Sequence, residues 1–243
     1  MNEDERALAI NCYGYGRWDS RYWFIGLEEG QAPWENNNFN KRAQAFRELN
    51  RDGLCDCPKF HKRIGEYRWH EINPKNGLVD LQSTWKYLIL LLMAFKGTPT
   101  DVERRYDFQR AYQSNRWGMD GDEAGETCVI ELSGLPANNS TVSKERPEET
   151  RRQIEVIRPT RIKRIQESIL KHNPEFVVMY GITAREHWSR IAGVPLQSGI
   201  PQNVGRTAFL LAQHPTAHYK NGQKKDQYWI DLGIRLRTES LRS

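Results

Sequence analysis

The sequence is poor in cysteine, and its cysteines do not follow a common metal-binding pattern. Only four occur, and no two of them form a Cys-x-x-Cys pair. A zinc or iron–sulfur site built from Cys55, Cys57 and His61 is conceivable, but this spacing matches no standard ligand set. Reduced thiols in a reducing compartment are therefore the prediction, and we expect neither a metal nor a cofactor.

Long apolar runs are also missing. The longest, Tyr87–Phe95, has nine residues, whereas a membrane-spanning helix needs about 20. The first five residues are mostly acidic or polar, and Ala7–Ile10 is too short to form the apolar core of a secretory leader. We therefore expect a soluble, cytoplasmic protein that does not bind membranes and needs no obligate protein partner.

No repeat, low-complexity tract or linker divides the 243 residues, which predicts a single domain over 1–243. The hydrophobic fraction of 38% and the charged fraction of 28% are typical of a globular protein. A net charge of +5 and a pI near 9.0 favour a polyanionic partner, and DNA is the partner we expect.

Apolar patterning predicts alternating strands and helices. Four short runs rich in β-branched or aromatic residues are predicted strands: Tyr22–Ile25, Cys128–Leu132, Phe176–Tyr180 and Thr207–Ala212. Six segments are predicted helices: Lys41–Asn50, Leu81–Phe95, Asp101–Gln113, Pro147–Lys171, Thr183–Ile191 and Asp226–Leu236. Pro159 should break or kink the fourth, and Thr183 should be the N-cap of the fifth. The fold class expected is α/β, with three α/β/α layers around a mainly parallel sheet.

Polar motifs follow three of the predicted strands. A turn with two carboxylates, Gly26–Gly30, follows the first, Glu131 ends the second before Ser133–Pro136, and His214 opens a His-Pro-Thr motif after the last. Ligands of such sheets bind outside the carboxyl ends of the strands, so we expect these groups on one edge. Neighbours in an extended chain point opposite ways, so only one of Glu28 and Glu29 should face the cleft.

In order and rough spacing, these motifs resemble those of the uracil-DNA glycosylase superfamily. The resemblance extends over most of the span from Tyr22 to Leu236 and implies that family's fold. It favours Glu28 over Glu29 as the working carboxylate. Two departures stand out: Glu29 replaces the family's usual proline, and Glu131 replaces the asparagine of uracil-specific members.

The resemblance also implies roles for the remaining motif residues. Phe39 would stack on a flipped base, although a core position is as plausible for it and Trp34 is a rival. His218 and Tyr219 lie where the family's wedge loop enters the duplex. Glu131 would contact the base. Ser133 and Thr216 would contact phosphates of the DNA backbone.

The function expected is that of a monofunctional DNA glycosylase, which flips a nucleotide and hydrolyses its N-glycosidic bond without a cofactor. Glu28 would orient or deprotonate the water, and His214 would stabilise charge on the departing base. Basic residues expected to contact phosphates are Arg158, Arg161, Lys163, Arg164, Lys220, Lys224 and Lys225.

An ionised Glu131 only accepts hydrogen bonds, which favours the amino group of cytosine over O4 of uracil. A modified cytosine, such as a hydroxymethylated or glucosylated phage base, is therefore the expected substrate, in a defence enzyme. If Glu131 is protonated, it can also donate to N3. The alternative to base reading is that Glu131 only braces the Ser133–Pro136 loop. Alternatives are a catalytically silent DNA-binding member of the fold, a repair glycosylase for uracil or deaminated bases, and a small-nucleotide hydrolase or transferase.

Overall fold

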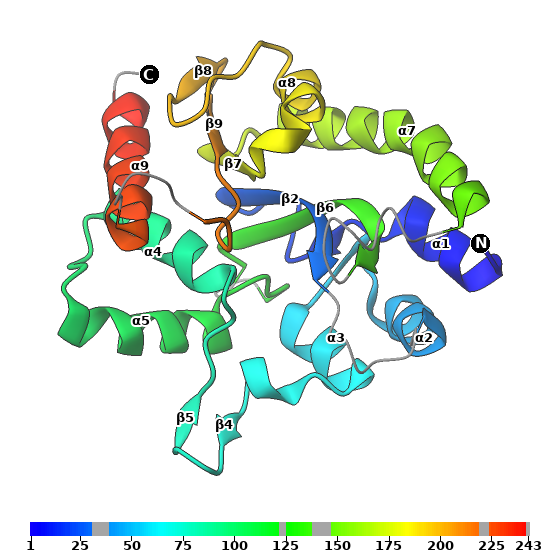
Figure 1. The fold of residues 1–243 in the computed structure, drawn as a ribbon, viewed down its shortest axis with the longest axis horizontal. Helices are drawn as coiled ribbons and strands as arrows, with labels where there is room; N and C mark the ends of the chain where they lie inside the picture. Colours follow the sequence, from blue (N-terminus) through cyan, green and yellow to red (C-terminus); the bar gives the residue numbers. More distant parts are fainter. Residues whose placement is uncertain (31–38, 122–124, 138–146, 219–223, 242–243) are drawn as a thin grey trace.

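The computed structural model describes residues 1–30, 39–121, 125–137, 147–218 and 224–241. A seven-stranded mixed sheet with the order β3-β1-β6-β2-β7-β9-β8 forms its centre (Figure 1). The four central strands are parallel: β2 (Tyr22–Gly30), β6 (Thr127–Ala137), β7 (Phe176–Tyr180) and β9 (Thr207–Ala212). Three short strands extend the sheet at its edges: β1 (Gly14–Tyr15), β3 (Leu54–Cys55) and β8 (Gln202–Val204). Among these, β1 is antiparallel to β6, and β8 is antiparallel to β9.

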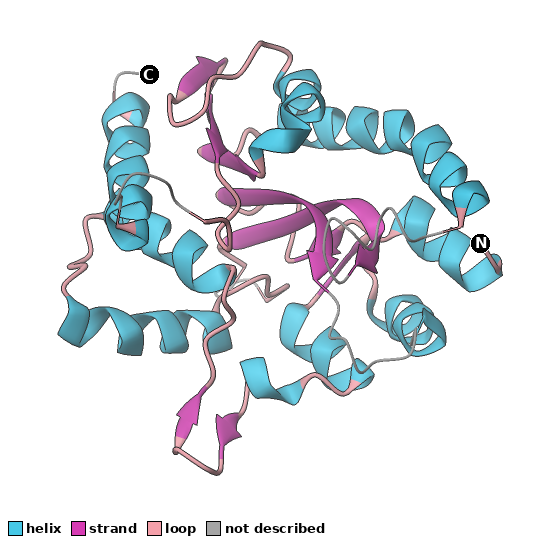
Figure 2. Cartoon of the chain, viewed as in Figure 1, coloured by secondary structure: helices cyan, strands magenta, loops and turns pink. Residues whose placement is uncertain are grey.

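Helices cover both faces of the sheet, as Figure 2 shows, and this confirms the α/β class with three layers. One face is covered by α7 (Glu148–His172) and α8 (Arg185–Ala192). The other is covered by α2 (Phe39–Leu49), α3 (Cys57–Ile64), α4 (Trp85–Lys96), α5 (Val102–Asn115) and α9 (Lys225–Ser240). The remaining elements are α1 (Glu3–Asn11), which packs against β6 and α2, the 3₁₀ turns η1 (Tyr67–Trp69) and η2 (Ile182–Ala184), and a hairpin of β4 (Ile72–Asn73) and β5 (Leu78–Val79). No helix in the described ranges is long and apolar enough to cross a membrane.

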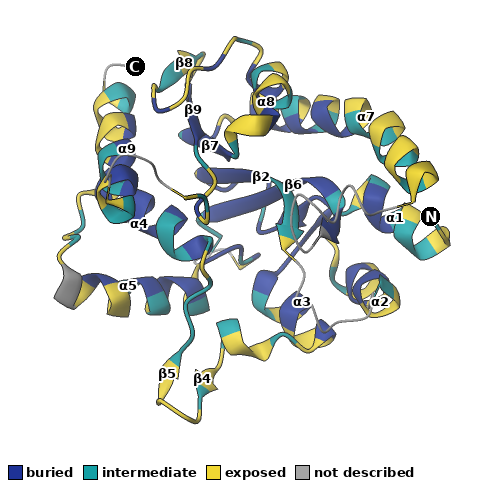
Figure 3. Ribbon diagram, in the orientation of Figure 1, coloured by how far each residue is buried: buried dark blue, intermediate teal, exposed yellow. Residues whose placement is uncertain are grey.

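The central strands alternate their side chains between two hydrophobic cores, because successive residues of a strand point to opposite faces. In β2, Phe24 packs toward α4 and α9, whereas Trp23 and Ile25 pack toward α7 and α8. These strands are buried on both faces, as Figure 3 shows in dark blue. The predicted buried helix over 81–95 is confirmed as α4, but it begins at Trp85. Its start is delayed because the side chain of Gln82 accepts hydrogen bonds from the first free backbone N–H groups.

Two predicted motifs lie inside strands rather than in turns. Gly26–Gly30 is the second half of β2, and Ser133–Pro136 belongs to β6, so the predicted turn and loop are wrong. The reason is pairing: Gly26 lies opposite Glu131, and Glu28 lies opposite Ser133, beyond the point where β7 ends. The two strands therefore extend together, and their polar residues lie at the carboxyl end of the parallel part of the sheet, beyond β7.

The structure also bears on two predictions about helices. Of the break or kink predicted at Pro159, the break is wrong, because α7 continues from Glu148 to His172. The carbonyl that loses its donor to this proline belongs to Glu155, which is exposed to solvent. Thr183 is not an N-cap: it lies within η2, and α8 follows with no side-chain cap.

Candidate active site at the carboxyl ends of the strands

Glu29 is the most strongly bound carboxylate of the extended strand pair. Its Oε2 accepts hydrogen bonds from the Tyr15 hydroxyl and from Nη1 of Arg42, both at 2.9 Å. His61 Nε2 faces Oε1 at 3.5 Å. Burial alone would raise the pKa of Glu29, but Arg42, His61 and Tyr15 together lower it to about 2. Glu29 is therefore a fixed negative charge throughout the neutral range.

The pairing of β2 with β6 is irregular where Glu29 lies, a β-bulge whose extra residues belong to β6. The register of β2 and β6 shifts between Glu28 and Gly30, and strict alternation would point Glu29 to the same face as Leu27. Instead its carboxylate turns toward α2 and α3. Glu28 lies before the shift and shares a face with Gly26, and its charge also acts on Glu131. The prediction that only one of the two glutamates can face the site assumed that the side chains of β2 alternate regularly between the faces of the sheet, and the irregular pairing at Glu29 interrupts this alternation.

Glu131 lies on β6, beside both glutamates. Its Oε1 accepts a hydrogen bond from the Tyr180 hydroxyl at 3.2 Å, and its Oε2 is buried with no partner among the described residues. Burial, followed by the negative charge of Glu29, raises the pKa of Glu131 well above its ordinary value. This shift favours the neutral carboxylic acid, which has one donor and one acceptor. A side chain at Gly26 would collide with both Tyr180 and Glu131.

His214 directly follows β9 and has a defined tautomer. Its Nδ1 accepts the backbone N–H of Thr216 at 3.2 Å and lies 2.8 Å from the Thr216 hydroxyl. Partial burial, and to a smaller extent Lys225, lowers the pKa of His214. The imidazole is therefore neutral at physiological pH, and its proton lies on Nε2. Nε2–H remains a hydrogen-bond donor for a ligand.

Tyr180 connects these groups. It is the last residue of β7, its ring packs edge-on against the His214 ring with centroids 5.6 Å apart, and its hydroxyl binds Glu131. Tyr180 thus contacts both Glu131 and His214, which follow different predicted strands. Tyr180 is not among the predicted site residues, although its place at the end of a predicted strand, before Gly181, is a signal that could have identified it.

The remaining predicted contact residues have different surroundings. Phe39 is the first residue of α2; it is half-buried and packs against the core, in agreement with the alternative core interpretation. The Ser133 hydroxyl is buried and bonds the backbone of Leu135. His218 is exposed on the loop after β9. Trp34, Tyr219 and Lys220 lie outside the described residues.

Most of the basic residues expected to bind phosphate on α7 are already engaged. Arg161 is buried and donates to the backbone carbonyls of Leu132 and Glu131 in the middle of β6, so the prediction that it contacts phosphate is wrong. Its remaining donors reach carbonyls at the end of α1. Exposed ion pairs hold the other three to acidic neighbours: Arg158 to Glu155, Lys163 to Glu167 and Arg164 to Asp52. On α9, Lys225 lies over the Tyr87 ring, while Lys224 is exposed.

A second polar cluster adjoins Glu29 on the side of α3. Cys57, His61 and His70 bring one ligand atom each to within 4.8 Å of one another. Cys55, which the sequence suggested alongside Cys57 and His61, is not part of this group. Burial, and then His61, lowers the pKa of His70 to about 3. A groove of about 530 Å³ lies next to the hairpin, and no residue predicted for the active site lines it.

The strand-end groups offer three different chemical states in one place: the ionised carboxylate of Glu29, the neutral carboxyl of Glu131 and the neutral imidazole of His214. Titratable groups whose environments push their pKa values apart are the usual basis of acid–base and electrostatic catalysis. In comparisons with known proteins, no family model matches the chain and no curated protein sequence matches it.

Proposed function

We propose that this protein is a DNA N-glycosylase, which hydrolyses the bond between a flipped base and its sugar. One observation carries the proposal: neighbouring parallel strands bring together Glu29, with a pKa near 2, and Glu131, with a strongly raised pKa. Glycoside hydrolysis commonly uses two carboxyl groups in different protonation states. The resemblance of the motifs to the uracil-DNA glycosylase superfamily supports the same reaction and the same fold.

The two neighbouring glutamates suit different parts of this reaction. The transition state is an oxocarbenium-like sugar, which a nearby fixed negative charge stabilises. Glu29 suits that electrostatic role, because its lone pairs are engaged by Tyr15 and Arg42 and its low pKa makes it a weak base. Glu28 remains the proposed group that orients or deprotonates the attacking water.

His214 suits the departing base. A base leaves with negative charge on its ring, and a preorganised donor at that position lowers the barrier. Because Thr216 binds Nδ1, the Nε2–H of His214 is available as this donor, without the need for a charged imidazolium. Tyr180 fixes the ring from one side.

Glu131 is the proposed reader of the base. In the protonated carboxyl group one oxygen donates a hydrogen bond and the other accepts one, and Oε2 has no partner among the described residues. This pattern fits N3 and the 4-substituent of a pyrimidine. The preference for cytosine over uracil assumes that Glu131 is ionised. A protonated Glu131 can both donate and accept, so it can pair with cytosine and with uracil. We propose a pyrimidine substrate, with a modified cytosine as the first candidate.

The test is incubation with duplex and single-stranded oligonucleotides that each carry one uracil, cytosine, hydroxymethylcytosine or glucosylated hydroxymethylcytosine. Alkaline cleavage then scores the abasic sites. We expect release of at least one of these bases by the native chain, and loss of that release in His214→Ala. If no base is released while folded protein still binds the oligonucleotides, the activity is wrong and a silent DNA-binding role remains.

A small-nucleotide hydrolase or transferase is the second candidate, because Arg161 is buried and the other basic residues of α7 already pair with carboxylates. Exposed ion pairs are weak and can exchange for phosphate, so they do not exclude DNA. Salt dependence separates the two candidates. Affinity for duplex DNA that falls steeply and linearly with salt on a log–log scale supports the glycosylase, and a flat dependence with turnover of free nucleotides supports the second candidate.

A further inference from the structure

The cluster of Cys57, His61 and His70 has the composition and the local geometry of a metal site. Asp56 caps α3, so Cys57 is its first residue and His61 follows one turn later on the same face. Gly65, in the left-handed conformation at φ 93°, ends the helix, and the chain returns through η1 to bring His70 beside them. Cys57 and His61 are buried and His70 is half-buried.

The distances between the three ligand atoms are close to those around zinc. Cys57 Sγ lies 3.9 Å from both His61 Nδ1 and His70 Nε2, and the two nitrogens are 2.9 Å apart. Tetrahedral zinc with ordinary bond lengths requires separations of about 3.5 Å between sulfur and nitrogen and about 3.3 Å between nitrogens. Shifts of about half an ångström convert one triangle into the other, which small side-chain rotations supply.

Glu29 gives His61 the tautomer that a metal ligand needs. Because the Glu29 carboxylate faces His61 Nε2 at 3.5 Å, an acceptor stands beside Nε2, so the ring proton belongs there and the lone pair of Nδ1 faces Cys57 and His70. Metal-binding histidines commonly donate their second ring N–H to such a carboxylate. Tyr15 and Arg42 hold that carboxylate in turn.

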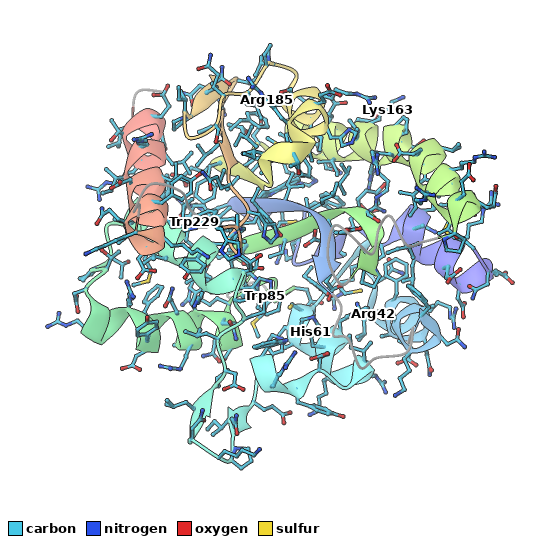
Figure 4. All side chains as sticks on the ribbon, in the orientation of Figure 1. Arg42, His61, Trp85, Lys163, Arg185 and Trp229 are labelled. Atoms are coloured by element: carbon cyan, nitrogen blue, oxygen red, sulfur yellow. The ribbon has the colours of Figure 1, made fainter. Side chains whose placement is uncertain are left out.

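The ring of His61 is also held in place by packing. Trp85 stacks on it at 5.4 Å with an interplanar angle of 5°, and Figure 4 shows His61 between Trp85 and Arg42. A ligand ring fixed on both edges and one face loses little freedom when it binds an ion. A thiolate with two imidazoles suits zinc rather than magnesium or calcium, which prefer oxygen ligands.

We propose that Cys57 Sγ, His61 Nδ1 and His70 Nε2 bind a zinc ion, with Glu29 as the outer partner of His61. Three protein ligands leave one tetrahedral position for water. The ion would fasten the segment from α3 to the β4–β5 hairpin and would connect it, through His61, to the carboxylate network of β2. This inference does not depend on the proposed glycosylase activity.

The test uses the full chain without a histidine tag, purified without chelators, with zinc measured by inductively coupled plasma mass spectrometry. We expect stoichiometric zinc in the native protein and in Cys55→Ser, and loss of it in Cys57→Ser and His70→Gln. Cys55 is the matched control, because it is equally buried two residues away. A chain that binds no zinc after dialysis against zinc chloride, or a Cys57→Ser chain that keeps it, overturns the proposal.

Cobalt gives a second measurement that does not depend on the folding of a variant. Native protein stripped of metal and titrated with cobalt chloride should develop the strong visible bands of a tetrahedral site and a thiolate-to-cobalt charge-transfer band. The same charge-transfer band should appear in Cys55→Ser. Bound cobalt with no thiolate band would exclude Cys57 as a ligand and overturn the proposal.

Discussion

Tyr180 donates a hydrogen bond to one oxygen of Glu131 at 3.2 Å, while the other oxygen of that carboxyl is buried with no partner among the described residues. An ionised carboxylate in this position would be poorly solvated and close to the charge of Glu29, which is why its pKa is strongly raised. The protonation of Glu131 therefore depends on folding, and the free energy of unfolding should depend on pH accordingly.

Glu131→Gln should make the protein more resistant to alkaline conditions. In the native chain Glu131 is protonated when folded but ionises near its ordinary value when unfolded, so the folded state holds the extra proton. Stability from this group is complete below the ordinary glutamate pKa and falls as pH rises toward the raised one, by up to about 1.4 kcal/mol per pH unit. Glutamine is always neutral and removes this loss.

Urea unfolding of both proteins at a series of pH values measures the effect. The two stability curves should run close together at acidic pH and separate as pH rises, with the glutamine variant above the native chain. Parallel curves would mean that Glu131 is ionised in the folded protein, and its proposed donor role would be lost.

Arg42→Met should destabilise the protein by roughly 3 kcal/mol at neutral pH, because it leaves the charge of Glu29 without its main partner in a largely enclosed site. Removing both charges in Arg42→Met with Glu29→Gln should recover part of the loss. In the native chain, the stability from Glu29 is present above its ordinary pKa and is lost as pH falls toward 2. The difference in stability between the native chain and the single variant should therefore be largest at neutral pH and shrink as pH falls, because protonation of Glu29 removes the unpaired charge of the variant. Urea unfolding at a series of pH values measures this difference. A single variant as stable as the native chain would contradict the ion pair.

The central strands and the main helices could be predicted from the sequence, because apolar periodicity reflects burial directly. The motif around Gly26–Gly30 could not be assigned correctly: its glycines resemble turn residues, and only pairing with Ser133–Pro136 across the sheet keeps both segments extended. The bulge opposite Glu29 belongs to the same pairing. Tyr15 and Arg42, which bind Glu29, are separated from it in sequence by 14 and 13 residues, so no local pattern could identify them.

The role of Arg161 was beyond sequence analysis for a related reason. On a helix rich in basic residues, a buried arginine looks the same as an exposed one. Only the tertiary fold brings the carbonyls at the end of α1 and in the middle of β6 within reach of its guanidinium.

Arg161→Met should destabilise the protein by at least about 3 kcal/mol, since it leaves several buried carbonyls without donors, each at a cost of about 1–3 kcal/mol. Arg164→Met is the matched control three residues further along α7: it breaks an exposed ion pair with Asp52 and a cation–π contact with Trp18, each worth about 1 kcal/mol or less. Denaturant unfolding measures both. If the two variants lose equal stability, or if Arg161→Met instead weakens DNA binding at full stability, the structural role of Arg161 is wrong.

Glu28→Gln and Glu29→Gln should fail in different ways. If Glu28 handles the attacking water, its amide variant should slow base release by roughly 10²- to 10⁴-fold, with stability and substrate binding near those of the native chain. Glu29→Gln should mainly lower stability, because it removes the anion that Arg42 and Tyr15 bind.

The comparison uses single-turnover rates on the best substrate of the base panel, at a temperature where circular dichroism shows both variants folded. His214→Ala gives the reference loss for a residue on another strand, about 10²- to 10³-fold for one electrostatic donor. If Glu29→Gln is the slower of the two glutamate variants under these conditions, Glu29 is the carboxylate that handles the water.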